Sequence, residues 1–519
     1  MASTWATVPV NALAFADDPT LVCKDARSAQ RILSTVQGKL ASNGLHIKPS
    51  KCFSLSLKSG QFDKTRKFSL NDTLVDNIDS APMKFLGLYI YGKHQKSNTA
   101  KFLISKLTTL MAKVDRLLIR GQYKVRIYDQ YVTSCIRFDM SVCDVAQSNL
   151  DALDTVVRKY IRKWCGMPQS THIGYVFHSS GLGISSPSHL YRVGHASTLA
   201  VSTNSDPVLQ SAIQATLDSD NAHNNAQHSE VADLVQGATN TRDIKTKARQ
   251  LSDSIVNDLA GSKVKQGEHG WIEALSSMDD DVTWKSCLVG LSEATFSFVT
   301  RALVDALPTN SNLALWKKVL SPNCGSCHSS NQTLLHVLNH CQSKLAAYTW
   351  RHNNVLLSLR NFLSSKLPDM ELRCDLHVSN NQFSEFPVHT VPYDIISTNL
   401  RPDICMIDRS SKTFTIVELT VPYESNISAA QERKSIKYMP LVAGLQELGY
   451  NTTFYSVEIC SRGVIAQGTS AIMRKLCHIS RRESKLFLQS LSRLVMRCSY
   501  VIFKEKDNRS AMFESIIHI

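Results

Sequence analysis

Residues 401–424 have the sequence RPDICMIDRSSKTFTIVELTVPYE, which carries the clearest strand pattern in the C-terminal part of the chain. Apolar and β-branched side chains dominate two short segments, 403–408 and 413–421, which is typical of β-strands. The four residues between them are all polar and form a natural turn. The stretch therefore predicts a β-hairpin.

The register of this hairpin brings two acidic residues together. If the turn places Asp408 opposite Thr413, then Asp403 falls opposite Glu418. Cross-strand partners place their Cβ atoms roughly 4.5–5.5 Å apart. Two carboxylates at that distance repel each other, and one takes up a proton unless a cation lies between them. Because Mg²⁺ and Mn²⁺ prefer oxygen ligands, the pair predicts a shared divalent cation.

A helix is expected after Pro422, with Lys434 and Lys437 three residues apart on one face. A lysine near such a cation can polarise an attacking water or stabilise the charge that develops on a phosphate. The acids and lysines together predict a metal-dependent site that cleaves DNA. The alternative is a surface hairpin with two ordinary acids, followed by an amphipathic helix with ordinary lysines.

A second metal site is predicted by the pattern Cys324-x2-Cys327-x8-His336-x4-Cys341. These ligand types and spacings are typical of a closed tetrahedral zinc site. Four protein ligands leave no open position for substrate, so we expect a structural role. His340 is the substitute ligand if His336 is not used. The alternative is four residues whose spacing arises by chance.

Two adjacent acids, Asp17 and Asp18, lie between the short apolar segments 12–15 and 20–23, which predict a hairpin. Paired carboxylates on a turn can bind the metal ions that activate a 3′-hydroxyl and hold a triphosphate. Lys51 follows at a place where a leaving pyrophosphate could be protonated. The alternative is an acidic turn with no function.

The charge of the chain favours a polyanionic partner. The formal net charge is +14 and the isoelectric point is about 9.1. From Lys93 to Lys163 there are fourteen Lys and Arg against six Asp, and a second basic cluster covers residues 474–497. Charge gathered in blocks indicates faces that contact phosphates. A basic protein without a nucleic-acid role is the alternative.

Size and composition indicate a globular protein of several domains. The chain has 519 residues, of which 43% are hydrophobic and 20% are charged. We found no stretch approaching the roughly 20 apolar residues of a membrane span and no signal-peptide pattern, so we expect an intracellular protein without a membrane partner. Fourteen cysteines spread along such a chain favour free thiols and a metal site over a disulfide framework.

Taken in order, these motifs resemble the C-terminal part of the reverse transcriptase–endonuclease polyprotein of a LINE-type (non-LTR) retrotransposon, of the class with a restriction-like endonuclease. The matching blocks, from polymerase palm to zinc knuckle to endonuclease, are Phe15-Ala16-Asp17-Asp18, Gly44 to Lys51, Phe85-Leu86-Gly87, Leu307-Pro308-Thr309-Asn310 with the Cys/His segment, Arg401-Pro402-Asp403, Glu418 to Glu424 and Lys434-x2-Lys437-Tyr438.

The resemblance implies a multidomain α/β and α fold. The expected parts are the C-terminal part of a polymerase palm (1–92), a basic helical thumb (93–200), a helical linker (201–300), a zinc-knuckle region (301–352) and a restriction-like α/β nuclease (353–519). Residues 203–270 of this linker are expected to be loosely packed because their sequence is polar without strong apolar periodicity.

The resemblance also implies a mechanism and partners. The nuclease would nick target DNA in the nucleus, and the freed 3′-hydroxyl would prime copying of the element RNA, with Mg²⁺ or Mn²⁺ and Zn²⁺ as cofactors. Only sixteen residues precede Asp17, so the first palm aspartate is missing and we expect a truncated chain that does not polymerise alone. Thr420 occupies the usual place of the nuclease lysine, which leaves Lys434 and Lys437 as candidates. The alternative function is a non-catalytic, zinc-dependent RNA- or DNA-binding protein derived from a decayed element.

Overall fold

The computed structural model describes the chain except for residues 1–11, 16–17, 60, 79–81, 92–94, 170, 172–173, 204–225, 262–269, 329, 377, 380–381, 384–387 and 509–519. The chain forms two compact units, which are described separately. The first comprises residues 1–117, 127–157 and 185–252, and the second comprises residues 118–126, 158–184 and 253–519.

The first unit begins with the predicted hairpin. Strand β1 (Ala12–Phe15) pairs antiparallel with β2 (Asp18–Leu21), so the second strand starts at Asp18 and not at Thr20 as the sequence indicated. Helix α1 (Ala26–Ala41) follows the N-cap Asp25, whose carboxylate accepts a hydrogen bond from the Ser28 N–H at 2.8 Å.

Short elements complete the N-terminal region. They are the 3₁₀ turn η1 (Pro49–Lys51) and the strands β3 (Phe53–Ser54), β4 (Leu57–Lys58), β5 (Gln61–Phe62), β6 (Ser69–Leu70), β7 (Thr73–Leu74), β8 (Asp76–Asn77), β9 (Met83–Phe85) and β10 (Leu88–Ile90). Strands β9 and β10 form the second expected hairpin. Its two turn residues, Leu86 and Gly87, both have positive φ, the conformation of the tight turns that suit twisted strands.

Helices form the rest of the first unit. They are α2 (Gln95–Asp115), the π-helical turn η2 (Tyr128–Val132), α4 (Thr133–Val142), α5 (Gln147–Trp164), α7 (Pro187–Thr203), α9 (Ala226–Val235) and α10 (Thr241–Gly261), with α5 and α10 continuing into the second unit. A cluster of small and aliphatic side chains from α7, α9 and α10 is buried together: Ala196, Val231, Leu234, Ile244 and Ala248. The described part of the expected linker is therefore helical but more closely packed than its polar composition indicated.

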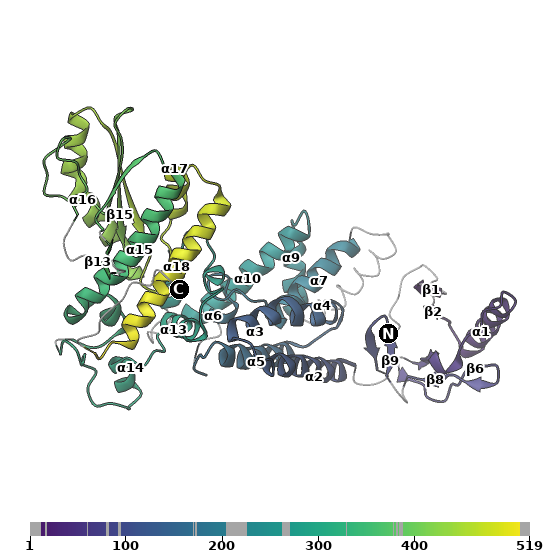
Figure 1. The fold of residues 1–519 in the computed structure, drawn as a ribbon. Helices are drawn as coiled ribbons and strands as arrows, with labels where there is room; N and C mark the ends of the chain where they lie inside the picture. The colour runs from purple at the N-terminus through teal and green to yellow at the C-terminus, as the bar shows by residue number, and fades with distance from the viewer. Residues whose placement is uncertain are drawn as a thin grey trace. The chain divides into compact units, whose positions relative to one another are not determined.

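The second unit contains a four-stranded sheet in the order β11-β14-β15-β16. Its strand β15 is labelled in Figure 1. Strands β11 (Glu371–Cys374), β14 (Ile404–Asp408) and β15 (Thr413–Thr420) are antiparallel neighbours. Strand β16 (Asn451–Glu458) runs parallel to β15, and the helix α16 (Ile427–Glu447) connects the two. Parallel neighbours need such a crossover.

Helix α16 covers one face of this sheet. The buried cluster between them comprises Val391, Cys405, Ile407, Phe414, Ile416, Tyr438, Leu441 and Leu445. The strand residues in this cluster alternate along β14 and β15, as a sheet with one packed face requires. Asp403 lies two residues before Cys405, and Glu418 lies two residues after Ile416, so both acids follow the same alternation. The alternation therefore places both acids on the α16 side of the sheet.

The remaining helices of the second unit pack around a long C-terminal helix. Helix α18 (Arg481–Lys504) contacts α15 (Leu345–Lys366), α17 (Thr469–Cys477), α13 (Glu293–Leu303) and α12 (Trp284–Cys287). The other elements are α3 (Gly121–Ile127), α6 (Gly174–Phe177), α11 (Gly270–Ser276), α14 (Asn310–Leu315), the short turns η4 (His336–His340), η5 (Gln342–Lys344) and η6 (Glu424–Asn426), and the strands β12 (Val378–Ser379) and β13 (Gln382–Phe383). Helix α15 begins at Leu345, so the expected domain boundary at residue 353 cuts through a continuous helix.

Among the described residues, α18 is the one helix long and apolar enough to meet the criterion for a membrane span. A buried core helix meets the same criterion, and 56% of its apolar window is buried within the structure.

Candidate metal centres

The acid pair forms in the predicted register. The β14–β15 ladder runs from Asp408 opposite Thr413 to Ile404 opposite Val417, so the next step places Asp403 opposite Glu418. The Asp403 N–H donates to Glu418 Oε2 at 3.1 Å. Asp403 is 9% exposed and Glu418 is 1% exposed. The hairpin therefore holds two carboxylates together in a largely buried place.

The electrostatics of the pair show the predicted conflict. Burial and the negative charge of Asp403 raise the pKa of Glu418. Burial also works against the ionised form of Asp403, but the charges of His352 and Lys434 outweigh it and lower the pKa of that carboxyl. Two carboxylates this close cannot both ionise without repulsion, so the pKa of one of them rises. A divalent cation between the acids would favour the charged form of both.

The structure distinguishes between the two candidate lysines. Both lie on α16, but only the Lys434 ammonium donates directly to Glu418 Oε1 among the described contacts. The Lys434 side chain is 21% exposed. Lys437 instead donates to the Tyr438 hydroxyl at 2.9 Å and lies over that ring. Tyr438 in turn donates to the Arg401 carbonyl at 2.8 Å. Lys434 is therefore the lysine in contact with the acid pair.

His352 was missed by the sequence reasoning, although it lies at the centre of the site. Its Nε2 atom is 3.3 Å from Asp403 Oδ2 and 3.2 Å from the Leu419 carbonyl oxygen. Burial opposes its charged form, but the charge of Asp403 and the hydrogen bonds raise the pKa of His352 to about 9. No local signal identifies it, because it precedes Asp403 by 51 residues on the helix α15.

A cleft of about 650 Å³ opens beside the acid pair. Its walls include His352, Leu419, Thr420 and Lys434, and the first and last of these contact the carboxylates directly. The Thr420 hydroxyl oxygen is buried and has no hydrogen-bond partner within the described chain. The cleft thus reaches two of the residues that contact the acids, His352 and Lys434.

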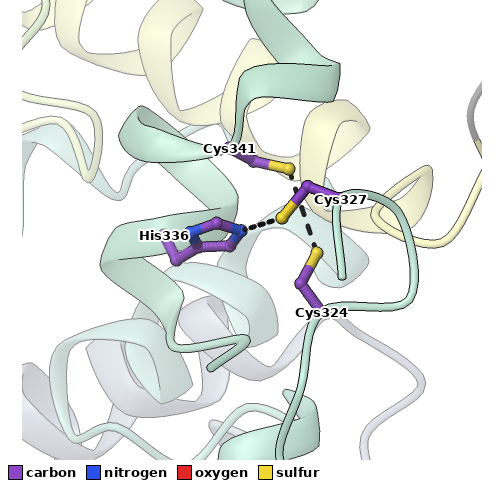
Figure 2. Close-up of side chains that lie close together, drawn as sticks. All are labelled: Cys324, Cys327, His336 and Cys341. Carbon is purple, nitrogen blue, oxygen red and sulfur yellow. Dashed lines mark hydrogen bonds between the residues drawn. The ribbon is translucent and has the colours of Figure 1, made fainter. Parts of the chain in front are cut away.

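The four predicted zinc ligands converge in the second unit. The donor atoms of Cys324, Cys327, His336 and Cys341 all lie within 4.8 Å of one another. Figure 2 shows the three sulfur atoms and the imidazole pointing toward one another. The Cys324 and Cys341 sulfurs are 3.9 Å apart, and Cys327 Sγ is 3.3 Å from His336 Nε2. This donor set fits a structural Zn²⁺ ion.

The surroundings of the cluster support metal binding. Ser330 Oγ lies 3.0 Å from His336 Nδ1, an arrangement that orients a ligand imidazole with Nε2 toward the metal. Burial and the neighbouring Cys324 raise the pKa of the Cys341 thiol, and a bound cation would reverse that effect. The substitute ligand His340 is not in the cluster, because its Nε2 faces the Asn426 amide at 3.4 Å. His336 is therefore the fourth ligand in this geometry.

The segment that carries the zinc ligands, residues 324–341, is joined to the neighbouring helices and the sheet by hydrogen bonds, several of them from a buried arginine. Arg351 is 1% exposed. It donates to the Leu338 carbonyl at 3.0 Å and to Ser499 Oγ at 3.1 Å. Asn339 donates to the Val421 carbonyl at 2.9 Å, just beyond β15. The cluster is thus positioned to stabilise the fold around the acid pair.

Two of the three candidate polymerase residues, Asp18 and Lys51, lie in the described part of the chain. Asp17 lies outside it. Asp18 is exposed at the start of β2, and Lys51 is exposed at the end of η1. No side-chain hydrogen bond or ion pair between Asp18 and Lys51 is present in the described part of the chain.

Comparison with known proteins gives a consistent picture. No family model matches the chain. It is 28% identical over 189 residues to the Retrovirus-related Pol polyprotein from type-1 retrotransposable element R2 of Nasonia vitripennis, covering 34% of this chain and 18% of the relative. It is 21% identical over 384 residues to the Retrovirus-related Pol polyprotein from type-2 retrotransposable element R2DM of Drosophila melanogaster, covering 70% of this chain and 34% of the relative.

This chain, which has a mixed α/β fold and a Cys/His cluster, is thus a homologue of retrotransposon Pol polyproteins. The relatives are the Pol polyproteins of R2 elements, which are non-LTR retrotransposons. The chain spans about a third or less of the length of these curated relatives.

Proposed function

We propose that the second unit is a metal-dependent endonuclease that nicks DNA. The observation that carries the proposal is the pairing of two buried acids, Asp403 and Glu418, with the ammonium of Lys434 at the wall of an open cleft. Two acids on neighbouring strands and a lysine beside them are the residues that restriction-like nucleases use. The similarity to R2 polyproteins supports the same conclusion.

Asp403 and Glu418 are the residues that would hold a Mg²⁺ or Mn²⁺ ion, since both are oxygen donors on neighbouring strands. When bound, such an ion polarises the phosphate and lowers the pKa of an attacking water. The backbone fixes the acids in place, because the Leu419 N–H donates to Asp403 Oδ2 at 2.8 Å. Lys434 places a positive charge at the cleft wall, where it can donate to a phosphate oxygen as negative charge develops.

The sheet supplies the precision that this chemistry requires. Both acids are anchored in a hairpin whose other side chains form the buried cluster beneath α16. Lys434 lies on that same helix, so the packing of α16 sets its distance from Glu418. A site built on strands and a packed helix holds its groups more closely than one built on loops.

We extend the proposal to the whole polyprotein. The nick would provide a 3′-hydroxyl that primes reverse transcription of the element RNA, and Asp17, Asp18 and Lys51 would belong to the polymerase. Target DNA and element RNA would be the partners, and the nucleus would be the site of action. The net charge of +14 supports nucleic-acid partners.

A nicking assay tests the nuclease. The zinc-loaded chain with Mg²⁺ or Mn²⁺ should convert supercoiled plasmid to the open circle, and Asp403→Asn or Glu418→Gln should abolish this. Glu447→Gln is the matched control, because Glu447 is an exposed acid at the end of α16. Nicking by both acid variants at the rate of the parent would refute the assignment. Salt-sensitive DNA binding without cleavage under either metal would favour the non-catalytic binding protein.

A further inference from the structure

His352 lies where a cation would contact the acid pair. Its Nε2 atom has two oxygen neighbours, Asp403 Oδ2 at 3.3 Å and the Leu419 carbonyl at 3.2 Å. The imidazole also forms part of the cleft wall, and 27% of the side chain is exposed. One nitrogen and two oxygens thus converge at the edge of an open cleft.

The spacing of these atoms is that of ligands around one metal ion. Mg²⁺ and Mn²⁺ bind their ligands at about 2.1–2.2 Å in octahedral geometry, so neighbouring ligands lie about 3 Å apart. The two measured separations, 3.3 Å and 3.2 Å, are close to that value. Only small adjustments would place a cation between Nε2, Asp403 and Leu419.

The other ring nitrogen supports the same assignment. His352 Nδ1 lies 3.2 Å from the Asn353 side-chain oxygen, which can only accept a hydrogen bond. Nδ1 therefore donates to that oxygen. Nε2 faces a carboxylate and a backbone carbonyl, which also accept, so it carries a proton in the absence of the cation, and a bound cation would take the place of that proton. Metal-binding histidines in proteins are oriented in this way, with the second nitrogen donating to a nearby oxygen.

We propose that His352 is a nitrogen ligand of the divalent cation in the nuclease site, together with Asp403 and Glu418. This inference rests on the proposed nuclease function and specifies the metal that the site prefers. A site of oxygens alone suits Mg²⁺, whereas an imidazole ligand favours the later transition metals. The chain should therefore bind Mn²⁺ and Co²⁺ more tightly than Mg²⁺.

Direct metal binding tests the proposal without relying on activity. The full chain is first loaded with one equivalent of Zn²⁺ and then titrated with Mn²⁺, with free Mn²⁺ followed by electron paramagnetic resonance. His352→Ala should weaken Mn²⁺ binding at least about tenfold, by analogy with the tenfold to hundredfold cost of lesser changes around metal sites. Pulsed measurements on the parent should show coupling of Mn²⁺ to an imidazole nitrogen, which His352→Ala removes.

A second variant separates a ligand from a merely structural residue. His352→Glu offers an oxygen at a similar reach from α15, so it should restore binding but shift the preference from Mn²⁺ toward Mg²⁺. His478→Asn is the matched control, because His478 is an exposed residue beyond α17 and should leave Mn²⁺ binding unchanged.

The outcomes distinguish this inference from the nuclease proposal. If Asp403→Asn abolishes Mn²⁺ binding while His352→Ala binds it as tightly as the parent and no nitrogen coupling is seen, then His352 is only a counter-ion and the inference is overturned. In that case the nuclease proposal survives. If the zinc-loaded parent binds no Mn²⁺ at all, both proposals fail together.

Discussion

The replacement of Lys434 by methionine tests which lysine serves the acid pair. Methionine keeps most of the apolar stem and removes the charge. In the structure the Lys434 ammonium contacts Glu418, which is 1% exposed, so the variant leaves that buried carboxylate without its charged partner. The pKa of Glu418, already raised by burial and by Asp403, should rise further.

Two magnitudes follow from this contact. Loss of one donor that stabilises transition-state charge costs about 10²–10³ in turnover, or roughly 3–4 kcal/mol. Breaking a buried ion pair costs about 3–5 kcal/mol when the remaining charge cannot be neutralised. Glu418 can take up a proton, so the metal-free variant should lose less, about 1–2 kcal/mol of unfolding free energy.

The assay is plasmid nicking by the zinc-loaded chain, with thermal unfolding followed in parallel to confirm that the variant is folded. Lys437→Met is the matched control, because Lys437 lies one turn along the same helix and contacts Tyr438 instead of the acids. We expect Lys437→Met to keep its nicking rate within about threefold. If Lys437→Met lost activity a hundredfold while Lys434→Met kept it, the placement of α16 over the acid pair would be wrong.

Two further predictions concern the zinc cluster and the hairpin turn. Removal of zinc by a chelator, or Cys341→Ser, should lower the melting temperature markedly, since structural zinc binds with an apparent free energy of about 10–16 kcal/mol in small domains. Cys374→Ser replaces a buried thiol outside the cluster and should keep the parent's sensitivity to the chelator, and chelator-resistant melting of the parent would contradict the assignment. Hydrogen bonds from Ser410 and Ser411 lower the pKa of Asp408 to about 2, so its ionised form stabilises the hairpin above about pH 4 and this contribution is lost as the pH falls through about 2. The unfolding free energies of the parent and Asp408→Asn should accordingly differ at pH 6 and converge toward pH 2, and an unchanged difference at pH 2.5 would refute the reasoning.

Much of the candidate site could be predicted from the sequence because its geometry is local. A four-residue polar turn and the alternation of buried side chains fix the β14–β15 register, and that register alone places Asp403 beside Glu418. The zinc ligands are likewise confined to eighteen residues, where a short turn and one helical segment determine their positions. In both cases hydrogen bonds between near neighbours along the chain decide which side chains meet.

The polymerase residues show a limit of the same reasoning. A hairpin was expected around Asp17 and Asp18, and the pairing of β1 with β2 confirms the hairpin itself. The role of the acids depends on other elements that must supply further ligands, and the described contacts do not bring Lys51 to Asp18. An acidic turn therefore predicts a local shape, and the catalytic role of its acids stays a prediction.

The hairpin, the facing acids and the Cys/His ligand set could be predicted from the residues alone, because each depends on short-range geometry. The tertiary structure decided which lysine reaches the acids, since Lys434 and Lys437 share a helix face and only the packing of α16 on the sheet separates them. It also brought His352 to Asp403 across 51 residues, through the packing of α15 against the sheet. Contacts of that kind depend on how whole elements bury their apolar faces, and no spacing within a single motif encodes them.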